Sequence, residues 1–465
     1  MRRLLTLLAL ASLASGLARQ VAPALPAGYS APAGYGDSIY PLLGDPGLDV
    51  THYDLTLSAT PGIDAVSGRA VLSVTALREL SQINLDFAGP RVLGVKVNGL
   101  AARHAQTGEK LMILPARPIA AGTAFTVTVA YSGTPALHLD TSDPDFSGTG
   151  GLRLGWITQG GGSYVLSEPD GSHTYFPCND VAADGATYSL HLDVPLGATA
   201  IASGVQTGQR TQGNRVYTDF QLEQPIPTYA LTVHVGRLQI VKQAGPGGIS
   251  VRNAFPVGLP ADVRSNFDQT PAMLDLLQSW FGAYPYPVYG VAVTEDPQIP
   301  ALETATLSTF PASGQGTLTT VHELAHQWFG DSLRLGDWSD VWLNEGFATY
   351  AELLWAQSQG KDPQALVDRW YTLLSNAPAR GLVAATAAQL FDSSSYQRGA
   401  LALHALRRAV GDPAFGNILA TYVRRFTSRS VRTADFLTVI GEIGGKAGLD
   451  AIQPWINGPE VPSSP

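Results

Sequence analysis

The sequence predicts a multidomain protein in which an N-terminal antiparallel β domain precedes an α/β domain that is rich in helices. Three observations lead to this prediction. Short runs of alternating apolar and polar residues recur between residues 53 and 235, and 49 glycines and 32 prolines provide turns between short strands. Helix-like periodicity follows over residues 260–283. With 465 residues, the chain is long enough for two or three domains.

The first 18 residues have the pattern of a secretory signal peptide. Arg2 and Arg3 precede an apolar run, and small residues end at Ala18. We therefore expect residues 1–18 to be a signal peptide and the mature protein to be secreted or periplasmic. The apolar run is too short to span a bilayer, and no other stretch reaches that length, so no membrane span is expected.

Residues 19–236 are expected to form the β domain. Its strand spacing and the turn signal Asn98-Gly99 favour antiparallel pairing. The predicted strands include residues 53–58, 70–74, 83–87, 92–97, 125–129, 217–220 and 229–235. The glycine-rich region 141–163 lacks the G-K-[ST] of a phosphate-binding loop, and we expect a flexible loop there.

The second domain is expected over residues 237–465. It begins with the amphipathic helix over 260–283, which should end at Gly282, followed by a buried strand over 288–293.

The formal net charge of −9 argues against nucleic acid as a partner. Cys178 is the only cysteine, so no intramolecular disulfide can form.

A metal site is predicted by His322, Glu323 and His326, which form the motif H-E-x-x-H. On a helix, positions i and i+4 differ by about 400° of rotation, so both histidines project from one face and can share a tetrahedral metal. Glu323 lies beside them. Because a catalytic zinc takes three protein ligands and leaves one position open, a third ligand must come from elsewhere in the chain.

Glu345 is the best candidate for that third ligand. It lies 19 positions after His326, which is far enough for the first helix to end, a loop to turn and a second helix to run back. We expect this second helix over 341–357, with Ser339 or Asp340 as its N-cap and Gly360 beyond its end. Glu352 lies seven positions after Glu345 on the same face and is expected to orient a ligand histidine.

The stretch resembles the aminopeptidase N family of zinc metallopeptidases, the gluzincins, whose signature is H-E-x-x-H, eighteen residues, then glutamate. The runs 322–330 (HELAHQWFG) and 342–348 (WLNEGFA) match the family pattern nearly residue for residue. The resemblance implies a thermolysin-like α/β zinc-peptidase domain after the β domain, one zinc per chain and peptide substrates. The family's larger members carry a further helical domain, so this chain looks like a short two-domain form.

The resemblance also implies a substrate site. The run 300–304 (PALET) resembles the family's Gly-x-Met-Glu-Asn motif, in which Glu303 would bind the substrate's free α-amine and Ala301 would lie along the docking edge. Pro300, Leu302 and Thr304 depart from that motif. Glu168 precedes the Phe-Pro-Cys-x-Asp element at 176–180 and would line the pocket for the first residue, although Gly185 stands where a lysine is usual.

Catalysis is expected to use Glu323 and Tyr396. Tyr396 lies in the run 396–399 (YQRG), which resembles the family's Tyr-x-Lys-Gly element with arginine for lysine, and it introduces a helix over 400–410. In the implied mechanism zinc acidifies a water, Glu323 takes the water's proton, and Tyr396 helps to stabilise the oxyanion.

Two alternatives remain open from the sequence. One is an endopeptidase, or a hydrolase of another bond, on the same zinc site, because fold and metal do not fix the substrate. The other is a zinc-bearing binding protein that has lost catalysis. Glu323 and Tyr396 bind no metal in this scheme, so their presence favours an enzyme.

Overall fold

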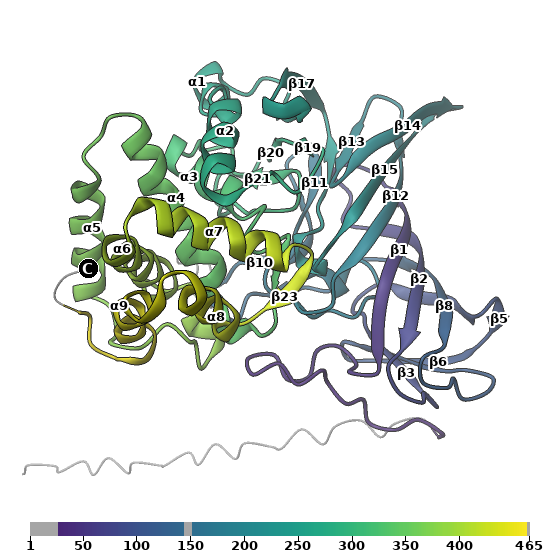
Figure 1. Cartoon of the computed structure of the whole chain (residues 1–465). Coiled ribbons are helices and arrows are strands. Elements are labelled where there is room, and N and C mark those ends of the chain that lie inside the picture. The colour runs from purple at the N-terminus through teal and green to yellow at the C-terminus, as the bar shows by residue number, and fades with distance from the viewer. Residues whose placement is uncertain (1–26, 144–150, 463–465) are drawn as a thin grey trace, which may run out of the picture.

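The computed structural model describes residues 27–143 and 151–462 and places a strand-rich first half beside a helix-rich second half (Figure 1). This order confirms the predicted fold class. The predicted signal peptide, residues 1–18, lies outside the described residues. None of the helices within these ranges combines the length and apolarity that crossing a membrane requires.

The largest sheet has eight strands in the order β14-β15-β12-β1-β2-β8-β4-β5. Their bounds are β1 (Leu48–Ala59), β2 (Val66–Ala76), β4 (Arg91–Val97), β5 (Leu100–Ala101), β8 (Ala124–Gly133), β12 (Ala186–Pro195), β14 (Val205–Gln212) and β15 (Arg215–Ile226). Neighbours pair antiparallel, except that β1 and β12 run parallel. Alternation is clear in β1, where Leu55 and Leu57 are buried and Thr56 is exposed, so one face of the sheet covers the core.

Two smaller sheets complete the first half of the chain. They contain β3-β7-β6 and β13-β16-β11-β10-β9. The bounds are β3 (Ile83–Asp86), β6 (Arg103–Thr107), β7 (Lys110–Leu114), β9 (His138–Leu139), β10 (Arg153–Gln159), β11 (Gly162–Leu166), β13 (Thr199–Ala202) and β16 (Val233–Gly236).

Two sequence expectations in this half were wrong in part. The region 141–163 is not simply a flexible loop, because β10 and β11 form a hairpin whose turn places Gly160 at a φ of 60°, which glycine adopts without strain. Residues 144–150 of that region lie outside the described ranges. The strand expected over 229–235 is shorter, because a 3-10 turn occupies Thr228–Ala230 before β16.

The second half begins with a mixed sheet in the order β17-β18-β20-β21, to which β19 adds by pairing with β18. Its strands are β17 (Leu238–Ala244), β18 (Ser250–Pro256), β19 (Val288–Tyr289), β20 (Val291–Val293) and β21 (Ser308–Phe310). The single strand expected over 288–293 is divided at Gly290. A Cβ there would lie 1.6 Å from the Arg252 carbonyl oxygen, so only glycine allows the two backbones to approach this closely.

Helices form most of the remaining chain. They are α1 (Ala261–Ser265), α2 (Thr270–Phe281), α3 (Thr317–Ala325), α4 (Trp342–Ser358), α5 (Pro363–Ser375), α6 (Gly399–Val410), α7 (Asp412–Phe426), α8 (Thr433–Ile443) and α9 (Gly445–Asn457), with the short strands β22 (Leu333–Leu335) and β23 (Arg429–Val431) between them. The single helix expected over 260–283 is two helices, because Pro271 fits the first turn of a new helix and not the interior of a continuous one. The second ends at Gly282 as expected.

Contacts between the halves position the site. Tyr229 packs on Trp338 with ring centroids 5.1 Å apart, and its hydroxyl accepts a hydrogen bond of 3.3 Å from Asn344 Nδ2 on α4. The Ala305 amide donates to the Ala230 carbonyl at 2.8 Å. The loop before β21 and the N-terminal end of α4 are therefore both held against the end of the β domain.

Candidate metal centre and active site

His322, His326 and Glu345 come together from two helices. His322 lies on α3, and His326 follows its last residue with helical backbone angles, so the two imidazoles leave one face with centroids 4.9 Å apart. Glu345 lies in the first turn of α4. Its Oε2 atom is 3.2 Å from His322 Nε2 and 3.5 Å from His326 Nε2. The sequence spacing thus converges on one three-ligand set.

The geometry of this set fits zinc. His322 Nδ1 lies 3.0 Å from Glu352 Oε1, and His326 Nδ1 lies 3.1 Å from the Phe329 carbonyl oxygen. Both oxygens accept, so each Nδ1 can donate, which leaves each Nε2 atom on the side of Glu345 to bind a metal once its proton is lost. Ligands about 2.0–2.2 Å from a tetrahedral zinc lie roughly 3.3–3.6 Å apart, close to the observed separations.

The charges around His322, His326 and Glu345 favour a cation bound between them. Burial lowers the pKa of His326, but the carboxylates of Glu303 and Glu345 outweigh burial and raise it to about 9. Burial also raises the pKa of Glu345, but the two imidazoles outweigh it and hold the pKa at about 2. A divalent cation would replace the protons on the imidazoles and satisfy the same carboxylates.

Glu323 lies beside the ligands without being one of them. Glu323, Glu303 and His326 form a cluster in which one carboxylate oxygen or imidazole nitrogen of each residue lies within 4.8 Å of those of the other two. Burial is the main cause that raises the pKa of Glu323 to about 8. A bound cation would favour the carboxylate form, so that Glu323 could accept a proton near neutral pH.

Tyr396 lies on a π-helical turn over Ser394–Arg398 that leads into α6. Its ring stacks on His322, with centroids 5.9 Å apart and an interplanar angle of 18°. Burial, followed by the charges of Glu345 and Glu168, raises the pKa of Tyr396 well above its usual value. The hydroxyl therefore stays protonated and available as a donor over a wide pH range.

Two further carboxylates reach the site. Glu168 comes from the β domain and Glu303 from the loop before β21, and one oxygen of each lies within 4.8 Å of the other and of a Glu345 oxygen. Both side chains are buried, and among the described residues neither Glu168 Oε1 nor Glu303 Oε1 has a hydrogen-bond partner. Burial is the main cause that raises both pKa values. Ala301, partly exposed, lies two residues before Glu303.

Gln327, for which no sequence motif predicts a role, connects helix α3 and the metal ligands to the loop that carries Glu303. Its Nε2 atom donates to the Glu303 carbonyl at 2.8 Å, and its Oε1 atom accepts from the Thr306 amide at 2.7 Å. The only sequence signal was its position next to His326. Its partners are 21 and 24 residues away, so no local pattern could identify them.

One local expectation near the site is wrong, and the structure gives a reason for the glycine at position 185. Neither Ser339 nor Asp340 caps α4. Both belong to a 3-10 turn that runs into α4, and Asp337 caps this turn by accepting from the Ser339 amide. At Gly185 a Cβ would lie 2.3 Å from the Arg334 guanidinium, so Arg334 on β22 occupies the space that a side chain at position 185 would need.

Comparisons with known proteins agree with this site. The model of the peptidase family M1 domain matches residues 266–455, which contain both metal-binding helices. The chain is similar to an M1 zinc metallopeptidase from Deinococcus radiodurans, with 44% identity, a TM-score of 0.87 and coverage of 93% of this chain and 99% of that chain. Yeast LTA4 hydrolase, at 22% identity, shares the fold, with a TM-score of 0.76 over 90% of this chain and 69% of that chain.

Curated relatives are longer than this chain. Aminopeptidase M1 of Arabidopsis thaliana is 28% identical over 316 residues, which make up 62% of this chain and 36% of that protein. Endoplasmic reticulum aminopeptidase 1 of Homo sapiens is 25% identical over 448 residues, which make up 86% of this chain and 46% of that protein. The chain therefore spans less than half the length of these curated relatives. Because the 44% identity extends over 99% of the Deinococcus protein, the chain belongs to the M1 family of zinc metallopeptidases.

Proposed function

We propose that this chain is a zinc-dependent aminopeptidase that removes residues from the N-termini of peptides. The observation that carries the proposal is the pair Glu168 and Glu303, buried beside the metal ligands with one unpartnered oxygen each among the described residues. A buried carboxylate without a donor is costly unless a cation pairs with it. The protonated α-amine of a peptide supplies both the charge and three N–H donors.

The position of this pair supports cleavage after the first residue. The oxygens of Glu168, Glu303 and Glu345 lie within 4.8 Å of one another, so an amine held by the first two would lie close to the metal ligands. Only the first peptide bond of a substrate bound in this way would reach the metal. An internal segment of a longer chain has no charged amine to pair with the two carboxylates.

In this proposal His322, His326 and Glu345 hold the zinc. When bound, zinc supplies a Lewis acid that polarises the scissile carbonyl and acidifies water. Glu323 accepts the water's proton and passes it to the leaving amine. Tyr396, whose raised pKa keeps its hydroxyl protonated, donates a hydrogen bond to the oxygen on which negative charge develops.

Known relatives support the substrate class. A mutant of the Deinococcus metallopeptidase has been crystallised with a Tyr-Ser-Ala substrate, and the curated relatives from plants and mammals are aminopeptidases. We extend the same class of reaction to this chain, with the two carboxylates as the part of the site that selects a free amine.

The test compares a free peptide with its N-acetylated form. Wild type is expected to cleave the free peptide and not the acetylated one. Glu303→Gln should lower kcat/KM for the free peptide about 10–100-fold, because a charge-assisted contact contributes about 1.5–3 kcal/mol. Glu223→Gln, an exposed glutamate in the β domain, is the matched control and should behave as wild type. Equal cleavage of both peptides by wild type would favour an endopeptidase.

A further inference from the structure

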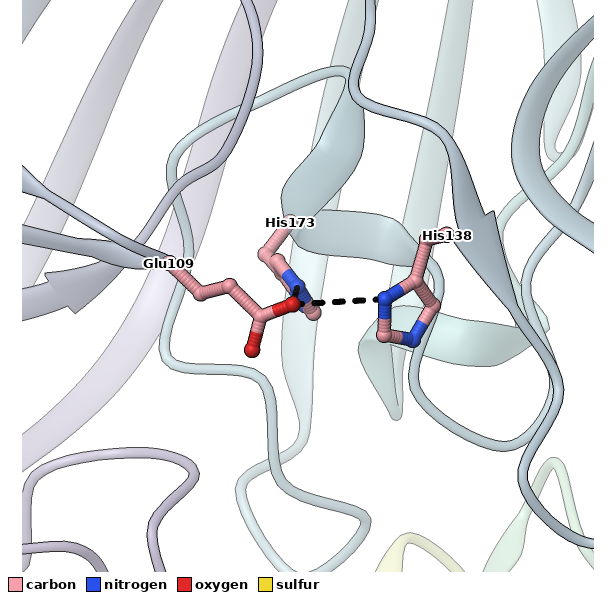
Figure 2. Close-up of side chains that lie close together, drawn as sticks. All are labelled: Glu109, His138 and His173. Carbon is pink, nitrogen blue, oxygen red and sulfur yellow. Dashed lines mark ion pairs between the residues drawn. The ribbon is translucent and has the colours of Figure 1, made fainter. Parts of the chain in front are cut away.

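A second cluster of potential metal ligands lies in the β domain and shares no residue with the active site. It consists of Glu109, His138 and His173. Glu109 lies in the turn between β6 and β7, His138 begins β9, and His173 lies in the 3-10 turn Ser172–Thr174. Figure 2 shows the Glu109 carboxylate facing both imidazoles. Three segments that are distant in sequence thus bring two nitrogens and one carboxylate to one point.

The separations in this cluster resemble those of the catalytic set. Glu109 Oε1 lies 3.4 Å from His138 Nδ1 and 3.9 Å from His173 Nε2. The corresponding separations from Glu345 Oε2 in the active site are 3.2 and 3.5 Å. All three ligand atoms of the cluster lie within 4.8 Å of one another. A shift of a few tenths of an ångström would bring them to tetrahedral spacing around a metal.

Each imidazole of the cluster has a carboxylate behind it. His173 Nδ1 lies 2.8 Å from Asp180 Oδ2, and His138 Nε2 lies 3.0 Å from Asp170 Oδ1. A proton on His173 Nδ1 leaves the lone pair of its Nε2 atom on the side of Glu109. The His173–Asp180 hydrogen bond matches the one between His322 and Glu352 in the active site, a contact that is common behind metal-binding histidines, whereas His138 and Asp170 are close without forming a hydrogen bond.

His173 is the strongest single indication that a ligand is missing from the cluster. Its side chain has no solvent exposure, and its Nε2 atom has no hydrogen-bond partner among the described residues. The backbone around it is fixed, because the Phe87 amide donates to the Glu109 carbonyl at 2.8 Å and the Ala88 amide donates to the His173 carbonyl at 2.9 Å. A buried nitrogen in a rigid setting without a partner is costly unless something binds it.

We propose that Glu109, His138 and His173 bind a divalent first-row transition metal, in addition to the zinc of the active site. Two imidazoles and one carboxylate suit zinc and its neighbours in the series better than calcium or magnesium, which prefer oxygen ligands.

A metal ion bound by Glu109, His138 and His173 would join three separate segments of the β domain. One of these segments, the one with His173, also carries Glu168 of the active site. The chain from Glu168 to His173 is short, and the Gly171 amide donates to the Ser167 carbonyl at 2.7 Å. A metal on His173 would therefore restrain the segment that carries Glu168. We expect the ion to stabilise the fold, with at most a secondary effect on catalysis.

Metal content tests the proposal in the full-length protein. His322→Ala/His326→Ala removes two catalytic ligands, and after equilibration with Zn²⁺ and gel filtration this variant is expected to retain one zinc per chain. Adding His138→Ala should remove that zinc, whereas adding His104→Ala, a histidine on β6 of the same domain, should not. If the double variant retains no zinc, or if His138→Ala leaves its zinc content unchanged, the proposal is wrong.

A second variant covers the case in which these changes prevent folding. Glu109 is about half exposed, with 54% of its side chain accessible, so Glu109→Gln should fold. In the otherwise intact protein it should lower bound Co²⁺ from two per chain to one, and it should abolish the rise in Tm that added Co²⁺ produces beyond saturation of the active site. Equal Co²⁺ content and equal Tm in Glu109→Gln and wild type would overturn the assignment.

Discussion

Replacing Gln327 with methionine tests how the active-site loop is fixed to the metal helix. The change keeps the side-chain volume but removes the amide that donates to the Glu303 carbonyl at 2.8 Å and accepts from the Thr306 amide at 2.7 Å. Gln327 is fully buried, so water does not replace these bonds without a rearrangement. Leaving a buried polar group unpartnered costs about 1–3 kcal/mol, so two such groups predict a loss of about 2–6 kcal/mol of stability.

Urea unfolding monitored by tryptophan fluorescence measures this loss, with Gln359→Met, an exposed glutamine just beyond α4, as the control. The same variant should raise KM for free peptides more than it lowers kcat, because the loop that presents Glu303 would lose its anchor. A stability change below about 1 kcal/mol would show that the two backbone groups find other partners, and that Gln327 does not fix the loop.

Three further predictions concern chemistry and pH. Glu323→Gln should keep the zinc, by metal analysis, and lose most turnover, because an amide cannot accept the water's proton; near-normal turnover would exclude the general-base role. Tyr396→Phe should lower kcat by roughly 10²–10³ with little change in KM, and a change confined to KM would make the hydroxyl a binding group. Burial raises the pKa of Asp184 to about 7, so the folded state holds a proton that the unfolded state releases above about pH 4. This contribution to stability is present at low pH and is lost as pH rises toward 7. The stability of Asp184→Asn relative to wild type should therefore increase between pH 5 and pH 8, and a constant difference measured by urea unfolding would contradict the assignment.

Local sequence patterns determine a large part of this fold and of its metal site. The spacing of His322 and His326 follows from the helical repeat, and the alternation in β1 follows from the two-residue repeat of a strand. The spacing after His326 selected Glu345, and the family resemblance added the roles of Glu168, Glu303 and Tyr396. These features depend on residues that are close in sequence, where backbone geometry alone fixes which side chains share a face.

Local patterns failed where a turn or a close backbone approach changed an element. The helix expected over 260–283 is interrupted before Pro271, and the strand expected over 288–293 is divided at Gly290. In the second case the cause is the carbonyl of Arg252, on another strand, which no pattern around Gly290 contains.

Only the tertiary structure decided which distant residues meet. Glu168 and Glu303 are 135 positions apart in the sequence. They come together as the proposed amine-binding site because the two halves of the chain pack against each other. Glu109, His138 and His173 have no motif spacing, yet one turn, one strand and one 3-10 turn bring them within ligand distance of a common point. The distance between these residues in space does not follow from their separation in sequence. Sheet pairing and core packing set that distance, and sheet pairing and core packing are properties of the whole fold.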